Sequence, residues 1–309
     1  MSASASTGAL DAATARRLDP MGVLLVAGGA VAFSGKAIIV KLCYRHGIDA
    51  ITLLALRMAV ALPFFLAMGV WAARRAAPLQ PGDRWRILAL GVCGYYLASL
   101  LDFMGLAYIS ATLERVILYL TPTLVLLIGV LLARRWPSRL QWIALGVSYL
   151  GVALAFGHDL HLGGSGVAIG SALVFGSALS YGVYLYGSGA LVGRIGAVRL
   201  TAYASIVASV LCIGQYLVLR PTPLARVAHE IYALSLLNGT LCTVLPVLAT
   251  MMGIRRIGAG PAAQIGMIGP VSTIILSLLI LHEPMGAWQI AGTALVAAGV
   301  LLVSRARAG

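Results

Sequence analysis

The chain has 309 residues, of which 61% are hydrophobic and only 10% are charged, and its mean hydropathy is +0.98. A soluble core of this size cannot bury so much apolar surface, so the composition excludes a soluble domain and predicts a protein of the lipid bilayer. The formal net charge of +13 would suggest nucleic-acid binding in a soluble protein, but here the charges lie at the ends of apolar stretches, and no nucleic-acid partner is expected.

Ten apolar stretches follow one another along the chain, and each is close to the about 20 residues that a helix needs to cross a bilayer. Residues 1–20 are rich in alanine, serine and threonine and are expected to form a disordered cytoplasmic tail, as residues 305–309 do at the other end. The sequence therefore predicts an all-α polytopic membrane protein with ten transmembrane helices. The predicted spans are 21–42, 50–72, 87–107, 110–133, 140–157, 166–188, 200–219, 231–252, 261–281 and 287–304.

The two halves of the chain are copies of each other. Gly105 matches Gly253 and Pro122 matches Pro270 at one constant offset of 148 positions. Each copy holds five predicted spans, and an odd number means that the second copy enters the membrane from the opposite face. We therefore expect two inverted five-helix repeats with a transport site between them. The expected repeats are residues 21–157 and 158–304.

The distribution of positive charge predicts the orientation of these helices, because lysine and arginine favour the cytoplasmic side. With the N-terminus inside, fifteen arginines fall in cytoplasmic segments, whereas the outer loops hold four cationic residues. Both termini are therefore expected in the cytoplasm and the protein in the inner (plasma) membrane. The four outer cations are Lys41, Arg45, Arg220 and Arg226.

Five ionisable residues interrupt the apolar stretches of the first repeat, Lys36, Arg57, Asp102, Glu114 and Arg115. Counting about 1.5 Å per residue puts all of them roughly 6–10 Å below the outer boundary of the hydrocarbon layer. A bare charge in lipid costs about 2.5–3.5 kcal/mol, so these side chains are expected to face the interior of the bundle and to pair.

Two interpretations of this cluster are open. In the first, Lys36 and Arg57 hold an anionic group of a substrate, while Asp102 and Glu114 orient them, bind a substrate amine or relay a proton. In the second, the charges form a structural network that locks the helices together, with Glu114 and Arg115 reaching the interface. We expect Lys36, Arg57 and Asp102 to bind substrate, and Glu114 and Arg115 to belong to a charge or coupling network.

Tyrosines and prolines add candidates. Tyr96 and Tyr119 lie in the two stretches that carry the acidic residues, and each can offer a substrate a ring face and a hydroxyl, although most aromatics in such proteins only pack. Pro122 and Pro270 occupy equivalent places in the repeats, where each removes a backbone hydrogen bond. Both helices are expected to kink there, either as part of a gate or as a static bend.

Other chemistry has no support in the sequence. The four cysteines have no paired spacing, and the histidines lie outside the apolar stretches without forming a ligand set. The Gly163–Gly166 run lacks the Lys-Ser/Thr ending of a phosphate loop. No metal, cofactor or ATP-driven step is expected, and no nucleophile–base pair is visible.

Three segments carry a resemblance to a known family. They are L-H-E-P-M-G-A-W-Q-I-A-G-T-A-L-V-A-A-G-V-L-L at 281–302, S-G-K-A-I-I-V-K-L at 34–42 and L-L-A-L-R-M at 53–58. With them the chain resembles the drug/metabolite transporter superfamily, in its branch with two tandem EamA-type domains, over residues 21–304. The resemblance implies ten helices, transport of small metabolites and, commonly, export. Arg135 and Trp136 stand where many relatives have an acidic turn residue.

These observations predict a secondary transporter that exports small polar or zwitterionic, amino-acid-like metabolites by alternating access, one five-helix bundle rocking against the other. Its expected partners are the small-molecule substrate and the bilayer, with possible proton coupling through Asp102 or Glu114, and the protein is expected to be a monomer or a homodimer. Two alternatives are a membrane enzyme acting on a lipid-linked substrate and a non-transporting partner subunit or channel.

Overall fold

The computed structural model describes residues 19–74, 78–133, 138–258, 262, 265–266, 268–283 and 286–306, and within these ranges every regular element is helical. Eight helices are long and apolar enough to cross a membrane, and two shorter apolar helices lie at 268–281 and 287–302. The chain is therefore a polytopic helical membrane protein, as predicted. The α-helices are α2 (Pro20–Arg45), α3 (Ala50–Ala73), α4 (Asp83–Gly91), α5 (Ala98–Leu106), α6 (Ala111–Leu118), α7 (Thr121–Ala133), α8 (Arg139–Ile195), α9 (Ala197–Leu219), α10 (His229–Gly239), α11 (Leu245–Ile257), α13 (Ile268–Leu276) and α14 (Ala287–Ala306).

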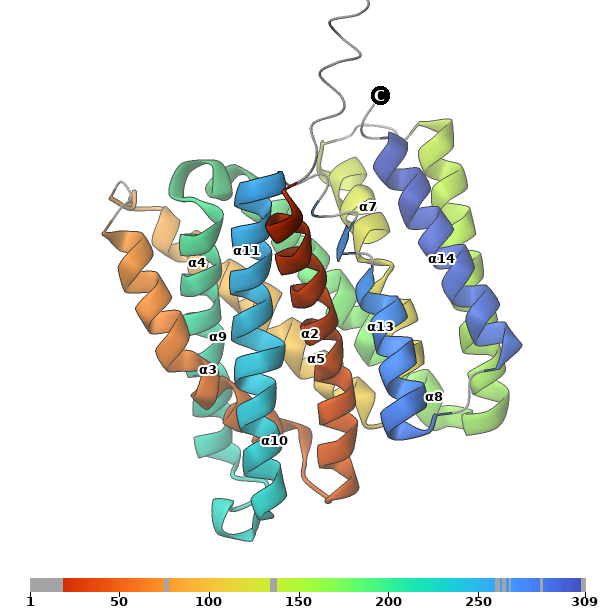
Figure 1. The fold of residues 1–309 in the computed structure, drawn as a ribbon, viewed down its shortest axis with the longest axis horizontal. Coiled ribbons are helices and arrows are strands. Elements are labelled where there is room, and N and C mark those ends of the chain that lie inside the picture. The colour runs from red at the N-terminus through yellow and green to blue at the C-terminus, as the bar shows by residue number, and fades with distance from the viewer. Residues whose placement is uncertain are drawn as a thin grey trace, which may run out of the picture.

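One helix, α8, supplies two spans. It has 57 residues, which at about 1.5 Å per residue is far longer than a bilayer is thick. Its apolar stretches, Arg139–Gly157 and Ser165–Gly189, are each long enough to cross. Figure 1 shows the ribbon folding back at the lower edge of the molecule, so that the two stretches run in opposite directions.

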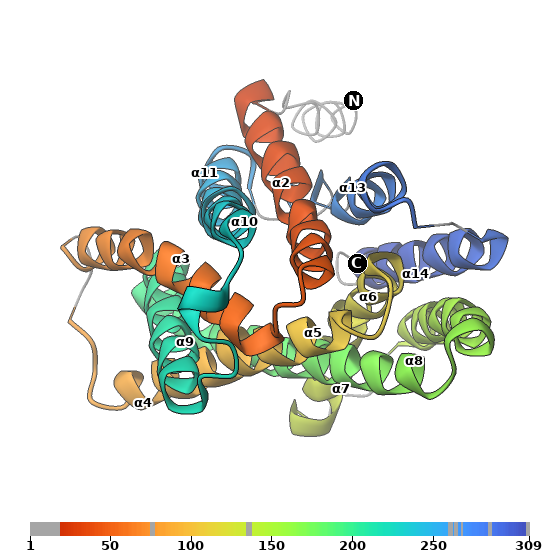
Figure 2. The ribbon, with the colours of Figure 1, turned by 90° about the horizontal axis from the view of Figure 1, so that it is seen from below.

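The described part of the chain begins and ends at the same end of the bundle. In Figure 1 the start of α2 and the end of α14 both lie at the top. We call the opposite end, where α2 ends at Arg45, the distal end. Seen from that side, α2 reaches toward the centre of the molecule between α10 and α11 on one flank and α13 on the other (Figure 2).

Close glycine contacts join the two repeats at equivalent places. A methyl group on Gly105 would collide with Val174 and with the carbonyl oxygen of Gly170, and one on Gly253 would collide with Val26 and with the carbonyl oxygen of Gly22. Each pair of positions is related by the offset of 148. The third helix of each repeat therefore packs against the first helix of the other, and Gly151 of α8 and Gly292 of α14 join the fifth and tenth spans in the same way.

Two π-helical turns also occupy equivalent positions. The segment η1 (Val92–Leu97) joins α4 to α5, and η3 (Thr240–Val244) joins α10 to α11 at the same offset of 148. A π-turn shifts the register of the helix and is frequent at functional sites. Further irregular turns are η2 (Leu224–Arg226) and η4 (Ser277–Leu281), the latter continuing α13.

The fourth span is interrupted at its proline. α6 ends at Leu118 and α7 begins at Thr121, just before Pro122. Proline has no amide hydrogen for the carbonyl of Leu118, and the hydroxyl of Thr121 donates to that oxygen at 2.6 Å instead. Pro270 lies inside α13. Part of the turn that precedes it, residues 263–264 and 267, lies outside the described residues.

Candidate functional site

A cavity of about 450 Å³ lies among helices of both repeats. Its wall takes side chains from α2, α3, η1, α5, α6, α7, α8, α9, η3 and α11. The size suits a small organic molecule. Most of the wall is apolar, and its charged groups are concentrated on α2, α3, α5 and α6.

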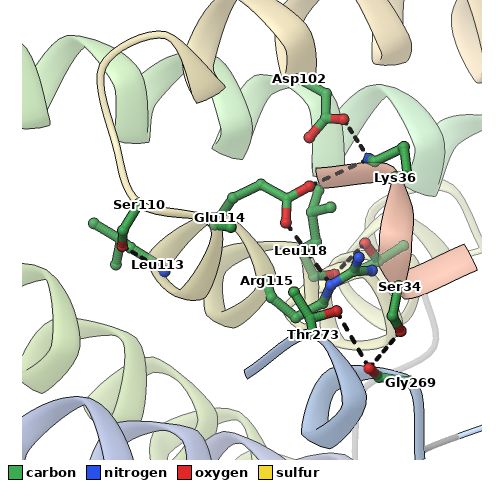
Figure 3. Close-up of polar contacts among 12 residues, drawn as sticks. Ser34, Lys36, Asp102, Ser110, Leu113, Glu114, Arg115, Leu118, Gly269 and Thr273 are labelled. Carbon is green, nitrogen blue, oxygen red and sulfur yellow. Dashed lines mark hydrogen bonds and ion pairs between the residues drawn. The ribbon is translucent and has the colours of Figure 1, made fainter. Parts of the chain in front are cut away.

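Lys36 forms the centre of a buried ion-pair triad. Its ammonium donates to Oδ2 of Asp102 at 2.5 Å and to Oε1 of Glu114 at 3.2 Å, so three helices, α2, α5 and α6, meet at one cation. Figure 3 shows Lys36 pointing between the two carboxylates. Lys36 and Asp102 line the cavity, whereas Glu114 is completely buried behind them.

The start of α6 explains why a carboxylate is stable at this depth. Ser110 caps the helix by accepting a hydrogen bond from the amide of Leu113 at 3.1 Å. Glu114 then falls in the first turn of α6, where the backbone amides that have no partner within the helix favour a negative charge.

Arg57 reaches the cavity from α3 and is held on one side only. Its Nε donates to the hydroxyl of Thr243 at 2.8 Å, and that hydroxyl donates to the carbonyl of Asn238 at 2.8 Å. The guanidinium carbon lies 5.2 Å from the centre of the Phe103 ring. Its Nη1 atom is buried and has no hydrogen-bond partner among the described residues.

Arg115 completes the charged wall. Its Nε lies 3.8 Å from Oε2 of Glu114, and its guanidinium carbon lies 5.7 Å from the centre of the Phe33 ring. Among the described residues, the Nη2 atom of Arg115 and the Oδ1 atom of Asp102 have no hydrogen-bond partner. The cavity is therefore bordered by two cationic residues and one carboxylate that each keep a buried polar atom available.

The remaining predicted site residues fall in different places. Tyr119 and Pro122 line the cavity. Tyr96 is not among the lining residues but packs against the apolar cluster at the distal end, and its neighbour Tyr95 lines the cavity instead. Pro270 is likewise outside the cavity wall, and the carbonyl before it, of Gly269, accepts from the hydroxyl of Ser34 at 2.6 Å.

Several wall residues of the second repeat are not singled out by the sequence. Tyr181 and Thr243 are examples, and each is the counterpart, at the offset of 148, of a wall residue in the first repeat, Phe33 and Tyr95. Tyr181 stacks on Tyr184 with ring centres 5.6 Å apart. The repeat itself was thus the signal that could have found them. Among the described residues no group of three histidine, cysteine or acidic side chains could hold a metal ion.

A bundle of ten apolar helices, built from two repeats around a charged central cavity, is the architecture of a membrane transporter. The model of the EamA-like transporter family matches the chain twice, at residues 20–157 and 168–305. The chain belongs to this family, and the resemblance to the drug/metabolite transporter superfamily is confirmed.

Curated relatives carry the same general description. The chain is 32% identical to the uncharacterized transporter YcbK of Bacillus subtilis (strain 168) over 283 residues, which cover 88% of each protein. It is 26% identical to the uncharacterized transporter sll1319 of Synechocystis sp., covering 73% of this chain and 69% of that protein. The chain is also similar to one solved crystal structure, with a TM-score of 0.62 and 15% sequence identity. The match covers 91% of this chain and 97% of the other, which shows a shared fold.

Proposed function

We propose that this transporter is a secondary exporter of small polar or zwitterionic, amino-acid-like metabolites, working by alternating access. The observation that carries the proposal is the set of available polar atoms on the cavity wall, Nη1 of Arg57, Nη2 of Arg115 and Oδ1 of Asp102. A purely structural charge network accounts for the ammonium of Lys36, but it leaves these three buried groups on the cavity wall without a purpose.

The arrangement suits a molecule with a negative and a positive group. In this proposal Arg57 binds a substrate carboxylate, with Arg115 as the second cation, because a guanidinium can hold a carboxylate through two parallel hydrogen bonds. Asp102 receives the substrate amine. Lys36 was expected to hold the anionic group, but its ammonium already serves two carboxylates, so its proposed role is to hold Asp102 in place.

The apolar remainder of the wall favours an uncharged side chain on the substrate. Phe33, Phe65, Tyr119 and Tyr181 border the cavity, and burial of apolar surface against such rings adds affinity without adding charge. Proton exchange at Asp102 or Glu114 is the proposed source of energy, and transport that did not vary with pH would contradict it.

The proposed orientation has both termini in the cytoplasm of a cell whose plasma membrane holds the protein. It is supported by the excess of arginines in the segments assigned to that side. Export then means that substrate enters the cavity from the end that carries the termini and leaves from the distal end.

The test compares the metabolites that accumulate in the medium of cells producing the intact protein, Arg57→Ala or Arg226→Ala. Arg226 is a matched control because it is an exposed arginine that does not line the cavity. The compound that the intact protein exports should accumulate equally with Arg226→Ala and at least about tenfold less with Arg57→Ala, since a charge-assisted hydrogen bond contributes about 1.5–3 kcal/mol.

Equal accumulation with all three proteins, at equal membrane levels, would remove Arg57 from the transport site. Saturable flux in vesicles that contain only the purified protein would separate a complete transporter from a partner subunit or a channel.

A further inference from the structure

A layer of polar contacts closes the distal end of the bundle. From the last turns of α2, Lys41 donates to the carbonyls of Leu106 at 3.2 Å and Ile109 at 2.9 Å, and Arg45 donates to the carbonyl of Leu281 at 2.8 Å. From the turn after η4, the Glu283 carboxylate accepts the amide of Ala111 at 3.1 Å. We call these contacts of Lys41, Arg45 and Glu283 the distal seal.

The position of Glu283 is set by the turn that carries it. His282 adopts a left-handed conformation, with φ of 56°, which ends η4 and reverses the chain. The Glu283 carboxylate is fixed further by the hydroxyl of Ser277, which donates to Oε2 at 2.5 Å. Glu283 thereby joins the second repeat to the first turn of α6, whose amide hydrogens favour an anion.

An apolar layer lies in the same region. Val40, Cys43, Leu106 and Leu281 belong to one buried cluster, and Val40 and Cys43 have no exposed surface. Water-filled passage through the distal end therefore requires the seal and this cluster to separate together.

The seal and the ion-pair triad are carried by the same three elements. Lys41 follows Lys36 by five residues on α2, Leu106 follows Asp102 by four on α5, and Glu114 follows Ala111 by three on α6. Each arm of the triad thus lies about one helical turn from a contact of the seal. Moving α2 away from α5 and α6 at the distal end would pull Lys36 from its carboxylates.

At the other end of the bundle the matching helix, α8, makes a different polar contact, because Arg194 in its last turn donates to the carboxylate of Asp83 and to the side-chain oxygen of Gln80. At the offset of 148, Lys41 corresponds to Gly189 and Arg45 to Gly193, and glycine has no side chain that could make the same contacts. The contacts of Lys41 and Arg45 therefore have no counterpart at the offset of 148, and the two ends are closed by different polar contacts.

We propose that Glu283 and the Lys36 triad form one interlocked gate, in which the distal end opens only when Lys36 releases a carboxylate. This rests on the proposed function, because it assigns the gate to the exit side of the same cavity. A substrate amine at Oδ1 of Asp102 shares the negative charge of that carboxylate with Lys36, so loading of the site weakens the lock. Glu283 is a positioning residue that holds the start of α6 and, through it, Glu114.

The test uses a native cysteine as the reporter. Cys43 is buried in the apolar layer of the seal, whereas Cys93 lies in η1, outside the seal. Two versions of the full chain each keep one of these cysteines and have the others replaced by alanine. The rate of labelling by a membrane-impermeant maleimide added outside intact cells is measured for Glu283→Gln, Lys36→Met and the matched control Glu230→Gln, an exposed acid at the start of α10.

Glu283→Gln and Lys36→Met should each label Cys43 about tenfold faster than the parent, the size expected for loss of one charge-assisted hydrogen bond, while Glu230→Gln should not. Cys93 labelling should stay unchanged, since a general loosening of the fold would raise both rates. Unchanged Cys43 labelling in both variants, or equal gains at Cys43 and Cys93, would overturn the gate.

A milder variant guards against loss of folding. Ser277→Ala removes one hydrogen bond from Glu283 and should raise Cys43 labelling less than Glu283→Gln does. An unchanged rate in this variant, if the stronger ones fail to fold, would also count against the gate. Because labelling needs no substrate, a failure of the gate remains distinct from a failure to find an exported compound.

Discussion

At the level of single residues, the charges of the site form two groups with different balances. The first group, the triad of Lys36, Asp102 and Glu114, has a net charge of one negative unit. The second group, Arg57 and Arg115, adds two positive charges. Counting Glu114, which lies behind the cavity wall, the five charged residues carry a net excess of one positive charge. The carboxylate of a zwitterionic substrate therefore has two cationic partners on the wall, Arg57 and Arg115, whereas its amine has one acidic partner there, Asp102.

The triad should tolerate loss of a carboxylate better than loss of its cation. Lys36→Met leaves two carboxylates buried together and should lower the free energy of unfolding by about 3–5 kcal/mol. Asp102→Asn keeps the pair between Lys36 and Glu114 and should cost about 1–3 kcal/mol. Thermal or denaturant unfolding of both variants in detergent measures the difference, and the reverse order would mean that the carboxylates are not ionised together.

At the level of helices, small residues set the distances between neighbours. Gly105 and Gly253 let α5 approach α8 and α11 approach α2, with no space left for a methyl group. Other glycines have no such constraint. Gly146, in α8, has no atom within 4 Å of the place where its Cβ would lie.

Gly105→Ala and Gly253→Ala should therefore each lower the unfolding free energy by about 1–3 kcal/mol through overpacking. Gly146→Ala should leave it unchanged or raise it slightly, because alanine loses less backbone entropy in a helix. Thermal unfolding midpoints of the three variants, compared with that of the parent protein, test this prediction. Equal stability of all three variants would show that the glycine contacts are looser than described.

The start of α3 provides a pH-dependent contact. Asp49 caps this helix and accepts the hydroxyl of Thr222 at 2.6 Å, which ties α3 to the connection after α9. Burial raises the pKa of Asp49, but hydrogen bonds from Thr222, Thr52 and Ile51 outweigh it, and the pKa lies below its ordinary value.

A depressed pKa in the folded state means that the contact stabilises the fold above the ordinary aspartate pKa and is lost as the pH falls through the folded value. The stability difference between the parent and Asp49→Asn should therefore shrink as the pH is lowered from neutral into that range. Unfolding midpoints of both proteins across the range measure it. A difference that is constant with pH would remove the Asp49 carboxylate as the cause.

At the level of the whole molecule, the sequence predicts the apolar helices and the repeat, because the hydropathy of the stretches and the constant offset between the two halves report these directly. Depth alone does not give the direction in which a side chain points around its helix. For that reason the sequence favours Tyr96 as a substrate-binding residue, whereas its neighbour Tyr95 lines the cavity. In the same way it predicts that Lys36 binds substrate, whereas the ammonium of Lys36 is bound to two carboxylates. The sequence does not single out Thr243 or Tyr181, because an isolated threonine or tyrosine in an apolar helix is unremarkable without its repeat partner.

The glycine contacts also constrain how such a molecule can move. Gly105 of the first repeat is seated on Gly170 of the second, and Gly253 of the second on Gly22 of the first. If the two halves swung apart as separate bodies, both contacts would break at once. The rigid units that hinge during a transport cycle are instead expected to be mixed, each holding helices from both halves, with α2 travelling with α11 and α5 with the second stretch of α8.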